Sequence, residues 1–397
     1  MSLFENVTLF PPDPIFGLGS RFKEDPNPNK VDLTVGIFRN EQLETPLMEC
    51  VRKGEALLHT VEKNKLYLPI EGEGAFIKGS QKLVFGQPFC QRHQAELLGI
   101  QTLGGTGGLR LGGEFLRSEV TKRIYLPDPT WPNHQGIFKG AQMEVATYPY
   151  YNQRTHTLEF ERMCAALSQA PEKSAVLLHG CCHNPTGCDL TKSQWEVLSS
   201  LFIKKRLVPL FDFAYQGFGE GIETDAWAIR YFANQGQELV VATSHSKNFG
   251  LYGERVGCLS IVCKSKTHSK AVASQMKKVA RTSYSNPPCH GARILAIIFN
   301  RPDLLSIWEE ELEAMRHRIT SIKNQFVNAL KEAIKVEKFD FLKNRHGLFS
   351  LLGIDHKKVQ MLLKRGIYLT ENGRINLTGL NQNNLSYVID GLTRAFM

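Results

Sequence analysis

The strongest constraint on the fold is a regular alternation between helical stretches and short apolar runs, from about residue 90 to residue 265. The apolar runs occupy residues 124–126, 142–147, 175–179, 207–213, 239–243 and 256–263. Alternation of this kind predicts an α/β fold in which helices cover both faces of a mostly parallel sheet. Ligands in such sheets lie beyond the carboxyl ends of the strands, so the residues after each run are the first candidates for a functional site.

The N-terminal part of the chain lacks this alternation. Residues 1–14 combine apolar side chains with a proline cluster, and we expect an extended arm that packs on another surface, such as a second subunit. Val31–Phe38 is expected to form a short strand broken at Gly36. Pro46 predicts a helix from about residue 46 to 63, because proline is tolerated in a first helical turn.

The C-terminal part predicts a second, smaller domain. From Pro302 to Ile334, apolar residues recur every three or four positions, which predicts one long amphipathic helix that bridges two domains. Strand-like runs at 348–352, 367–370 and 374–377 then alternate with helical stretches. We therefore expect residues 339–397 to form a small α+β domain.

Composition excludes several classes of protein. Hydrophobic residues at 42% and charged residues at 22% are typical of a globular chain. The net charge of +9 is scattered, and no basic segment is interleaved with aromatic residues, so we predict no nucleic-acid surface. No run approaches the roughly 20 apolar residues of a membrane span. The nine cysteines include no CxxC pair and Met1–Pro14 has no signal-like pattern, so we expect reduced thiols, no metal site and a cytoplasmic location.

A lysine follows the apolar run at 239–243, in Ser244-His245-Ser246-Lys247. Lys247 could hold an aldehyde as a Schiff base, and Arg255, eight residues later, could hold a phosphate beside it. This pattern favours pyridoxal phosphate as a cofactor. A lysine after a strand is also commonly a solvated surface residue, so the motif needs support from the rest of the chain.

A glycine-rich segment offers a second part of a phosphate site. Residues 104–108 read Gly-Gly-Thr-Gly-Gly and precede a helical stretch expected at 109–117. Backbone N–H groups and the Thr106 hydroxyl could meet a phosphate at the helix N-terminus, and Arg255 and the serines beside Lys247 add a cation and hydroxyls. A glycine cluster alone fits a flexible turn equally well.

Four residues at or after the ends of other runs suit a pyridine ring. Asp212 could keep a pyridinium nitrogen protonated, so that the ring accepts electrons from a carbanion. Tyr215 and Asn184 could hydrogen-bond the phenolic oxygen of the ring, and Trp131 could lie flat on it. Each has a structural alternative, such as a helix cap for Asp212 and a core anchor for Trp131.

Histidines near these positions are candidates for supporting contacts only. His134 and His179 could orient the residues that bind a ligand, although most histidines of this kind are structural. His245 lies between two serines that we assign to the cofactor, and the sequence offers no physical reason for a histidine there.

Taken together, these segments resemble the class I aspartate aminotransferase family of pyridoxal phosphate enzymes. They occur in the family's order with similar spacing, and the resemblance covers essentially the whole chain. The matching segments are Gly104–Gly107, Pro129–His134, His179–Gly187, Asp212–Phe218, Ser246–Gly250 and Tyr284–Pro288.

The resemblance implies an architecture as well as a cofactor. Its large domain would contain a mostly parallel, seven-stranded-type sheet between helices, beside a smaller α+β domain and an N-terminal arm. The implied boundaries are 1–11 for the arm, 46–311 for the large pyridoxal-phosphate-binding domain, and 12–45 with 312–397 for the small domain.

The resemblance also implies roles in cofactor binding. Lys247 would form the internal aldimine and then, once displaced, move a proton between the substrate Cα and the cofactor. Tyr67 would reach the phosphate bound by the neighbouring subunit. The residues that would hold the phosphate within one subunit are Gly105, Thr106, Ser244, Ser246 and Arg255.

Substrate recognition follows from the same resemblance. Arg374 would grip the α-carboxylate as a planar bidentate donor, assisted by Asn184, Trp131 and the backbone at Gly36. Arg281 would reach across a dimer to the distal carboxylate of aspartate or glutamate. A homodimer would then be required for a complete site.

Features of substrate specificity are mixed. An apolar Leu66 resembles the bacterial aromatic branch of the family, whereas Thr106 and Asn286 resemble the aspartate branch. We expect three further residues to extend an apolar wall for an aromatic ring, namely Leu18, Ile37 and Phe38.

The predicted activity is amino-group exchange among aspartate, glutamate and aromatic amino acids and their 2-oxo acids. A strict aspartate aminotransferase is the nearest alternative. A pyridoxal phosphate lyase or decarboxylase would have little use for both Arg281 and Arg374. A non-catalytic binding protein is the most distant alternative, since Lys247 and Asp212 are both present.

Overall fold

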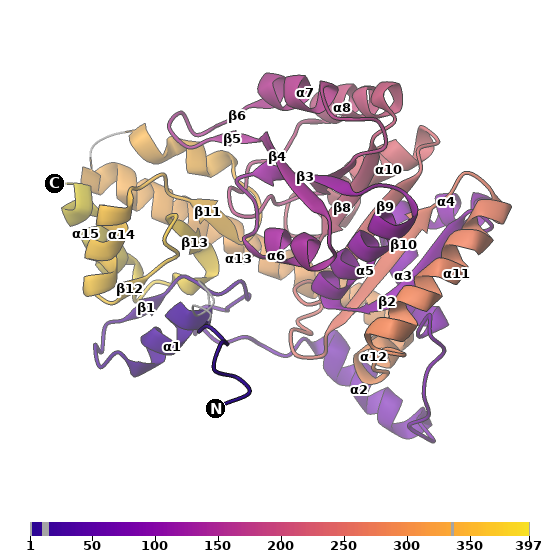
Figure 1. Ribbon diagram of the computed structural model, residues 1–397. Coiled ribbons are helices and arrows are strands. Elements are labelled where there is room, and N and C mark those ends of the chain that lie inside the picture. The colour runs from indigo at the N-terminus through magenta and orange to yellow at the C-terminus, as the bar shows by residue number, and fades with distance from the viewer. Residues whose placement is uncertain (1, 10–15, 335–336, 397) are drawn as a thin grey trace.

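The computed structural model describes residues 2–9, 16–334 and 337–396, and its centre is a seven-stranded sheet (Figure 1). The strand order is β2-β10-β9-β8-β7-β3-β4. The strands span Leu97–Leu103 (β2), Arg123–Asp128 (β3), Glu144–Pro149 (β4), Ala175–His179 (β7), Val208–Phe213 (β8), Leu239–Ser244 (β9) and Val256–Val262 (β10).

The sheet is mostly parallel, as predicted. Only the pairings of β10 with β9 and with β2 are antiparallel. The carboxyl ends of β2, β3, β7, β8 and β9 therefore meet at one edge, where β10 begins. The sequence predicted six of these strands and missed β2, in which the polar Gln101 and Thr102 are fully buried.

Helices cover both faces of the sheet, also as predicted (Figure 1). In β9, Val240 and Ala242 pack into one core and Leu239 and Val241 into the other, because successive side chains of a strand point to opposite faces. The first core is covered by α5 (Gly104–Glu119), α6 (Asn133–Gly140) and α11 (Lys266–Ser283). The second is covered by α2 (Glu49–Val61), α3 (Gly74–Phe85), α7 (Phe160–Ser168), α8 (Lys192–Lys205), α10 (Trp227–Asn234) and α12 (His290–Phe299).

The long helix α13 (Pro302–Ile334) has the predicted bounds and joins two cores. Trp308 and Leu312 pack under the sheet, whereas Phe326 and Leu330 belong to a separate core. That smaller core is built by α1 (Phe16–Glu24), β1 (Val31–Asp32), η1 (Glu337–Asn344), α14 (His356–Lys364), β12 (Ile367–Tyr368), β13 (Arg374–Asn376), η2 (Leu377–Gly379) and α15 (Leu385–Phe396). The small α+β unit is therefore as expected.

Short elements complete the fold. β11 (Phe349–Leu351) pairs with β13, and β5 (Tyr151–Asn152) pairs with β6 (Thr157–Leu158). Two short helices are α4 (Gln87–Arg92) and α9 (Ile222–Asp225). Within the ranges described above, no helix is long and apolar enough to cross a membrane.

Two predicted elements are shorter than expected. The strand predicted at Val31–Phe38 ends at Asp32, because the Asn376 side chain, instead of a strand neighbour, binds the carbonyls of Val35 and Ile37. The helix expected from residue 46 begins at Glu49. The Glu311 carboxylate there accepts the backbone N–H groups of Glu49 (2.6 Å) and Cys50 (3.0 Å), which fixes the first turn.

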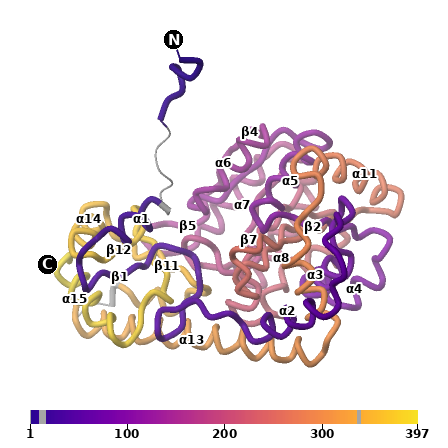
Figure 2. The backbone as a smooth tube through the Cα atoms, turned by 90° about the horizontal axis from the view of Figure 1, so that it is seen from below, coloured from indigo at the N-terminus to yellow at the C-terminus, as the bar shows by residue number. Residues whose placement is uncertain are grey.

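The N-terminal arm is described only in part. Leu3 and Leu9 are 97% and 98% exposed, and Figure 2 shows residues 2–9 projecting from the body of the chain. The rest of the predicted arm, at residues 10–14, lies outside the described residues.

Candidate active site

A cavity of about 630 Å³ lies where the strands end, between the sheet and the small core. Its walls include Lys247, Asp212, Asn184 and Trp131 from the sheet edge and Arg374 from β13. These residues are far apart in the sequence, but they lie close together because the parallel strands that carry them end at the same edge of the sheet.

Lys247 lies three residues past the end of β9 and is half-buried in this cavity. Its Nζ lies 4.8 Å from the centre of the Tyr215 ring. Burial lowers the pKa of Lys247 to about 8, and the cations Arg255 and Arg374 add to this effect, while Asp212 opposes it. An amine in this setting is partly neutral near pH 7 and can act as a nucleophile or a base.

Asp212 is held by a chain of hydrogen bonds. Its Oδ2 lies 2.8 Å from His134 Nε2, and the Thr130 hydroxyl joins His134 Nδ1 (2.7 Å) to His179 Nε2 (3.2 Å). Burial alone would raise the pKa of Asp212, but the His134 hydrogen bond and the nearby His179 and Lys247 lower it. Burial lowers the pKa of His179 to about 4. The carboxylate is therefore ionised and fixed in orientation, ready to face a cationic nitrogen.

An anion cradle lies at the start of α5. The helix begins at Gly104 itself, so the glycines expected to form a turn before the helix are its first turn. The φ of Gly104 is +67°, and a Cβ there would lie 2.5 Å from Arg255 Nη2. Glycine is thus required for the guanidinium to approach the helix N-terminus, where free N–H groups attract an anion.

Hydroxyl groups complete this cradle. Arg255 Nη1 donates to Ser246 Oγ (3.2 Å), and Ser244 Oγ donates to Ser246 Oγ (3.2 Å). Gly105 and Thr106 also line the cavity. The cradle thus joins a cation, three hydroxyl-bearing side chains and a helix N-terminus, a combination suited to a phosphate dianion.

Arg374 faces the cavity from the opposite side and is only 3% exposed. Its Nη1 donates to Asn184 Oδ1 (3.2 Å) and its Nη2 to the carbonyl of Thr34 (2.7 Å), and the guanidinium stacks 4.1 Å from the centre of the Phe349 ring. Its Nε has no hydrogen-bond partner among the described residues. Burial lowers the pKa of Arg374 to about 10, so the group is still charged at neutral pH and has donors left for a carboxylate.

Tyr215 and Trp131 lie beside the same cavity. Burial raises the pKa of the Tyr215 hydroxyl, which is therefore neutral and can donate a hydrogen bond. Trp131 meets the His134 ring edge-on, with 5.2 Å between ring centres. Gly36 also lines the cavity, and a Cβ there would lie 2.7 Å from the Phe349 ring.

Two predicted site residues do not line the cavity of their own chain. Tyr67 is 91% exposed in the segment between α2 and α3, and Arg281, near the end of α11, donates to Ser285 Oγ. Both were predicted to reach a neighbouring subunit, so their positions leave that prediction open. The expected apolar wall is mostly absent from the cavity. Only Ile37 lines the cavity, since Leu18 and Phe38 pack into the two cores and Leu66 is exposed.

The sequence also missed residues that the structure places in the site. Val35, Tyr252 and Phe349 line the cavity, and Thr130 links the two histidines. Thr130 lies within the segment Pro129–His134 that carries the family resemblance, and Tyr252 lies between Lys247 and Arg255. Val35 and Phe349 could not be predicted as cavity residues, because apolar residues beside short strands are typical of an ordinary hydrophobic core.

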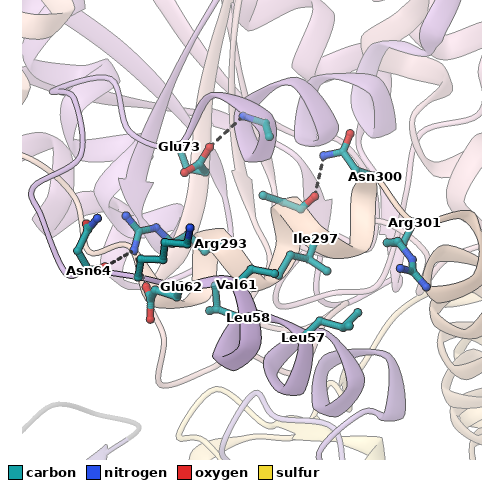
Figure 3. A pocket seen from close by; sticks show the side chains of 13 residues that line it. Leu57, Leu58, Val61, Glu62, Asn64, Glu73, Arg293, Ile297, Asn300 and Arg301 are labelled. Atoms are coloured by element: carbon teal, nitrogen blue, oxygen red, sulfur yellow. Dashed lines mark hydrogen bonds and ion pairs between the residues drawn. The ribbon is translucent and has the colours of Figure 1, made fainter.

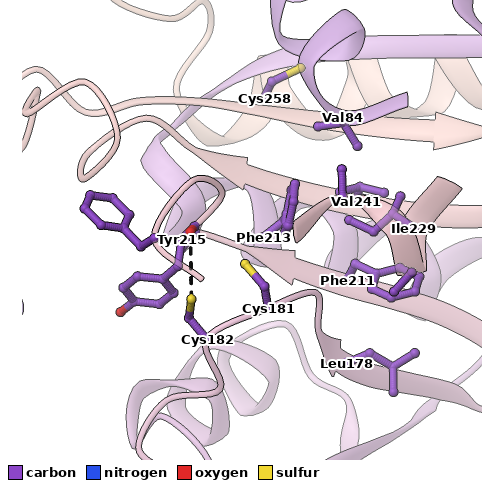
Figure 4. Close-up of a cluster of buried hydrophobic side chains, with 14 of the residues drawn as sticks. Val84, Leu178, Cys181, Cys182, Phe211, Phe213, Tyr215, Ile229, Val241 and Cys258 are labelled. Atoms are coloured by element: carbon purple, nitrogen blue, oxygen red, sulfur yellow. Dashed lines mark hydrogen bonds between the residues drawn. The ribbon is translucent and has the colours of Figure 1, made fainter. Parts of the chain in front are cut away.

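Adjacent cysteines lie behind the site. Figure 4 shows Cys181 and Cys182 within the apolar core, and Cys182 Sγ lies 4.0 Å from the carbonyl of Tyr215. They act as small buried apolar groups. Ligand atoms of both cysteines and Asp225 lie within 4.8 Å of one another, but the Asp225 carboxylate already accepts three backbone N–H groups.

Comparison with known proteins gives full-length matches. The model of the family "Aminotransferase class I and II" matches residues 28–392. An aspartate aminotransferase of Salmonella typhi is 42% identical over 98% of this chain and 99% of its own. A tyrosine aminotransferase of Klebsiella pneumoniae is 40% identical over 97% of this chain and 98% of its own.

Solved structures agree with these matches. An aromatic-amino-acid aminotransferase from Burkholderia pseudomallei, covalently bound to pyridoxal phosphate, superposes with a TM-score of 0.96. It is 42% identical and each chain covers all of the other.

Proposed function

The chain belongs to the class I and II aminotransferase family, and we propose that it exchanges amino groups among aspartate, glutamate and aromatic amino acids and their 2-oxo acids. One observation carries the proposal. Lys247, with a pKa of about 8, and the buried Arg374 face the same cavity, so an amine and a carboxylate-binding guanidinium are available to one small amino acid. Relatives named for aspartate and for aromatic substrates are about equally similar to the chain.

The cavity fits pyridoxal phosphate. The cradle of Arg255, Ser244, Ser246, Gly105 and Thr106 has the donors that its phosphate needs. Asp212, kept ionised by His134, would pair with the ring nitrogen, and the nitrogen would stay protonated. When bound, the cofactor supplies an electron sink that stabilises negative charge developing at the substrate Cα.

Other residues would orient the ring. Trp131 would cover one face, and Tyr215 and Asn184 would donate hydrogen bonds to the ring oxygen. The Asn184 side chain is already oriented, because its Oδ1 accepts from Arg374. This side chain also meets the Tyr215 hydroxyl, so the two groups lie together beside the cavity.

The substrate would be held and deprotonated by groups at opposite ends of the cavity. Arg374 would bind the α-carboxylate through its remaining N–H groups, with Asn184 and the backbone of Gly36 beside it. A neutral Lys247 Nζ would take the proton from Cα, which requires an amine of lowered pKa. Removing bulk water from these charges strengthens each interaction.

We further propose a homodimer with shared sites. Tyr67 and Arg281 lie outside the cavity of their own chain, and both would serve the cavity of the partner. A groove of about 700 Å³ lies between α2 and α12, and Arg293 and Glu62 form an ion pair in its lining. Figure 3 shows Leu57, Val61 and Ile297 along this groove. Val61 and Leu66 are exposed there or nearby, and a second copy would cover them.

The cellular location and the domain boundaries are part of the same proposal. The nine cysteines are free thiols, which supports a cytoplasmic location. We also propose a large domain at 46–311, a small domain at 12–45 and 312–397, and an arm at 1–11. The smaller core lies entirely within the small domain, which supports this division, although Phe38, Leu348, Phe349 and Leu351 pack into the core of the sheet.

Steady-state kinetics of the purified protein test the substrate range. The kcat/KM values for aspartate, phenylalanine and tyrosine with 2-oxoglutarate should all be measurable. Arg281→Leu should reduce the value for aspartate by at least about tenfold and leave phenylalanine within a few-fold, because one charged hydrogen-bonded contact is worth ~1.5–3 kcal/mol. Negligible turnover of both aromatic substrates would instead support a strict aspartate aminotransferase.

Mixing inactive variants tests the shared site. The Lys247→Ala homodimer should be nearly inactive on aspartate, and the Arg281→Leu homodimer should retain at most about a tenth of the wild-type activity. A heterodimer would contain one site with both residues intact, so random mixing should restore about a quarter of the wild-type activity. No recovery after subunit exchange, verified by tagged chains, would contradict sites that share Arg281.

A further inference from the structure

His245 occupies a position at which no sequence pattern explains a histidine. It lies between Ser244 and Ser246, whose hydroxyls form the anion cradle, and two residues before Lys247. The side chain is only 1% exposed and points away from the cavity, which it does not line. Its contacts are therefore with the protein interior beneath the cofactor site.

Two hydrogen bonds hold the imidazole. Nε2 lies 2.9 Å from Ser80 Oγ on α3, and Nδ1 lies 3.4 Å from Asn248 Oδ1. Since the Asn248 oxygen can only accept, Nδ1 carries the proton and Nε2 accepts from the Ser80 hydroxyl. The imidazole thus joins α3 to the residue that directly follows Lys247.

Aromatic rings enclose this link. The His245 ring meets Phe76, Phe249 and Phe299 edge-on, with 5.4–6.0 Å between ring centres. A Cβ at Gly79 would lie 2.0 Å from the Phe299 ring, so the glycine makes room for this aromatic cluster. Burial among these rings lowers the pKa of His245 to about 4, and the imidazole is neutral at physiological pH.

The same turn is anchored at other atoms. Trp308 Nε1 donates to the carbonyl of Asn248 (2.7 Å), and the backbone N–H of His245 donates to the carbonyl of Val256 (3.0 Å). These bonds fix the backbone on both sides of Lys247. The side chain of Asn248, however, is held by His245 alone among the hydrogen bonds of the described residues.

We propose that His245 is a positioning residue whose neutral imidazole, bonded to Ser80 and Asn248, sets the turn that presents the Ser244 and Ser246 hydroxyls and the Lys247 amine to the cofactor. This inference rests on the proposed function, because it assigns the turn to pyridoxal phosphate. It differs from a purely structural role, since loss of the two hydrogen bonds would misplace the cradle and the amine even in a folded protein.

Three variants separate the two roles. His245→Phe keeps an aromatic ring in the cluster and removes both hydrogen bonds. Ser80→Ala removes one of them and leaves the imidazole in place. Phe299→Leu is the control, because it disturbs the same aromatic cluster and removes no hydrogen bond.

The readouts are the Kd for pyridoxal phosphate by equilibrium dialysis, the pH midpoint of the bound cofactor's absorbance, and the unfolding temperature without cofactor. His245→Phe should raise the Kd about tenfold, the factor expected for one to two lost net hydrogen bonds, and should shift the pH midpoint. Ser80→Ala should raise the Kd about threefold, with a smaller shift in the same direction. Phe299→Leu should lower the unfolding temperature. It should leave the Kd within about twofold of the wild-type value and the pH midpoint within about 0.2 pH units of it, roughly the scatter of a neutral change.

Other outcomes would contradict either the role of His245 or the proposed function. If Ser80→Ala and His245→Phe both bind pyridoxal phosphate like the wild type and only lose stability, His245 is structural and the inference is wrong. If His245→Phe does not fold, Ser80→Ala alone decides between the two roles. If the wild-type protein itself fails to bind pyridoxal phosphate, the proposed function is what fails.

Discussion

Arg374→Lys tests how the substrate carboxylate is recognised. A guanidinium has five N–H donors, and two of the Arg374 bonds are committed within the protein, to Asn184 and to the carbonyl of Thr34. The remaining donors, Nε among them, can meet both oxygens of a carboxylate. A lysine ammonium has three donors, so after the same two internal bonds it could offer one.

The expected loss follows from that difference. One charge-assisted hydrogen bond contributes ~1.5–3 kcal/mol, so kcat/KM should fall by about 10- to 150-fold. The loss should be the same for aspartate and phenylalanine within about threefold, because both carry the α-carboxylate. The absorbance of bound pyridoxal phosphate should not change, since Arg374 is not part of the phosphate cradle.

The assay is steady-state turnover of both substrates with 2-oxoglutarate, beside a cofactor titration of each protein. Arg374→Met serves as a control, since it has similar length and no donor and should be more damaging than lysine. A loss below threefold in Arg374→Lys would refute bidentate binding by this residue. A loss confined to aspartate would mean that Arg374 reads the distal carboxylate.

Three further predictions concern the cofactor and the fold. Cofactor-free protein should bind pyridoxal phosphate faster as the pH rises through about 8, and the rate should then reach a plateau, because only the neutral Lys247 amine reacts. The rate is measured by stopped-flow absorbance, and a rate still rising at about pH 10 would contradict the lowered pKa of Lys247. Asp212→Asn should lower kcat by about two orders of magnitude with little change in the KM of aspartate, as for loss of one preorganised charge; near-wild-type kcat would exclude the pairing with the ring nitrogen. Glu311→Ala should lower the free energy of unfolding by about 1–2 kcal/mol in urea titrations, because two backbone N–H groups at the start of α2 lose their acceptor. An unchanged urea midpoint would show that water replaces the Glu311 carboxylate as the acceptor.

The sheet edge was predictable because the relevant signals are local. Asp212 is the penultimate residue of an apolar run, and Lys247 follows another, so the rule that ligands bind at strand ends was sufficient to group them. The strand β2 was missed for a physical reason. Gln101 and Thr102 are buried polar residues whose side chains bond the carbonyls of Pro288 and Gly104, and such distant or backbone partners leave no trace in a hydrophobic pattern.

Contacts between residues far apart in the chain could not be predicted from the sequence pattern. Arg374 and Asn184 are 190 residues apart, and only a family resemblance could pair them. His245 was unexplained because its partner Ser80 lies 165 residues earlier, on a helix that no pattern relates to the lysine turn. The apolar wall failed for a similar reason, since Leu18 and Phe38 are buried in cores whose contacts the sequence does not specify.

The site is assembled from the two cores, and this division has a consequence for binding. Lys247 and Asp212 belong to the sheet, whereas Arg374 lies on β13 beside the small core and meets the sheet side through its hydrogen bond to Asn184 and its stacking on Phe349. The helix α13 runs through both cores, and its buried Lys323 donates to the carbonyls of Lys343 (3.0 Å) and Arg345 (2.6 Å) just before β11. A substrate whose carboxylate binds Arg374 while its amino group meets Lys247 spans the two cores, so part of its binding energy is available to fix their relative position and to hold Cα beside the amine that must deprotonate it.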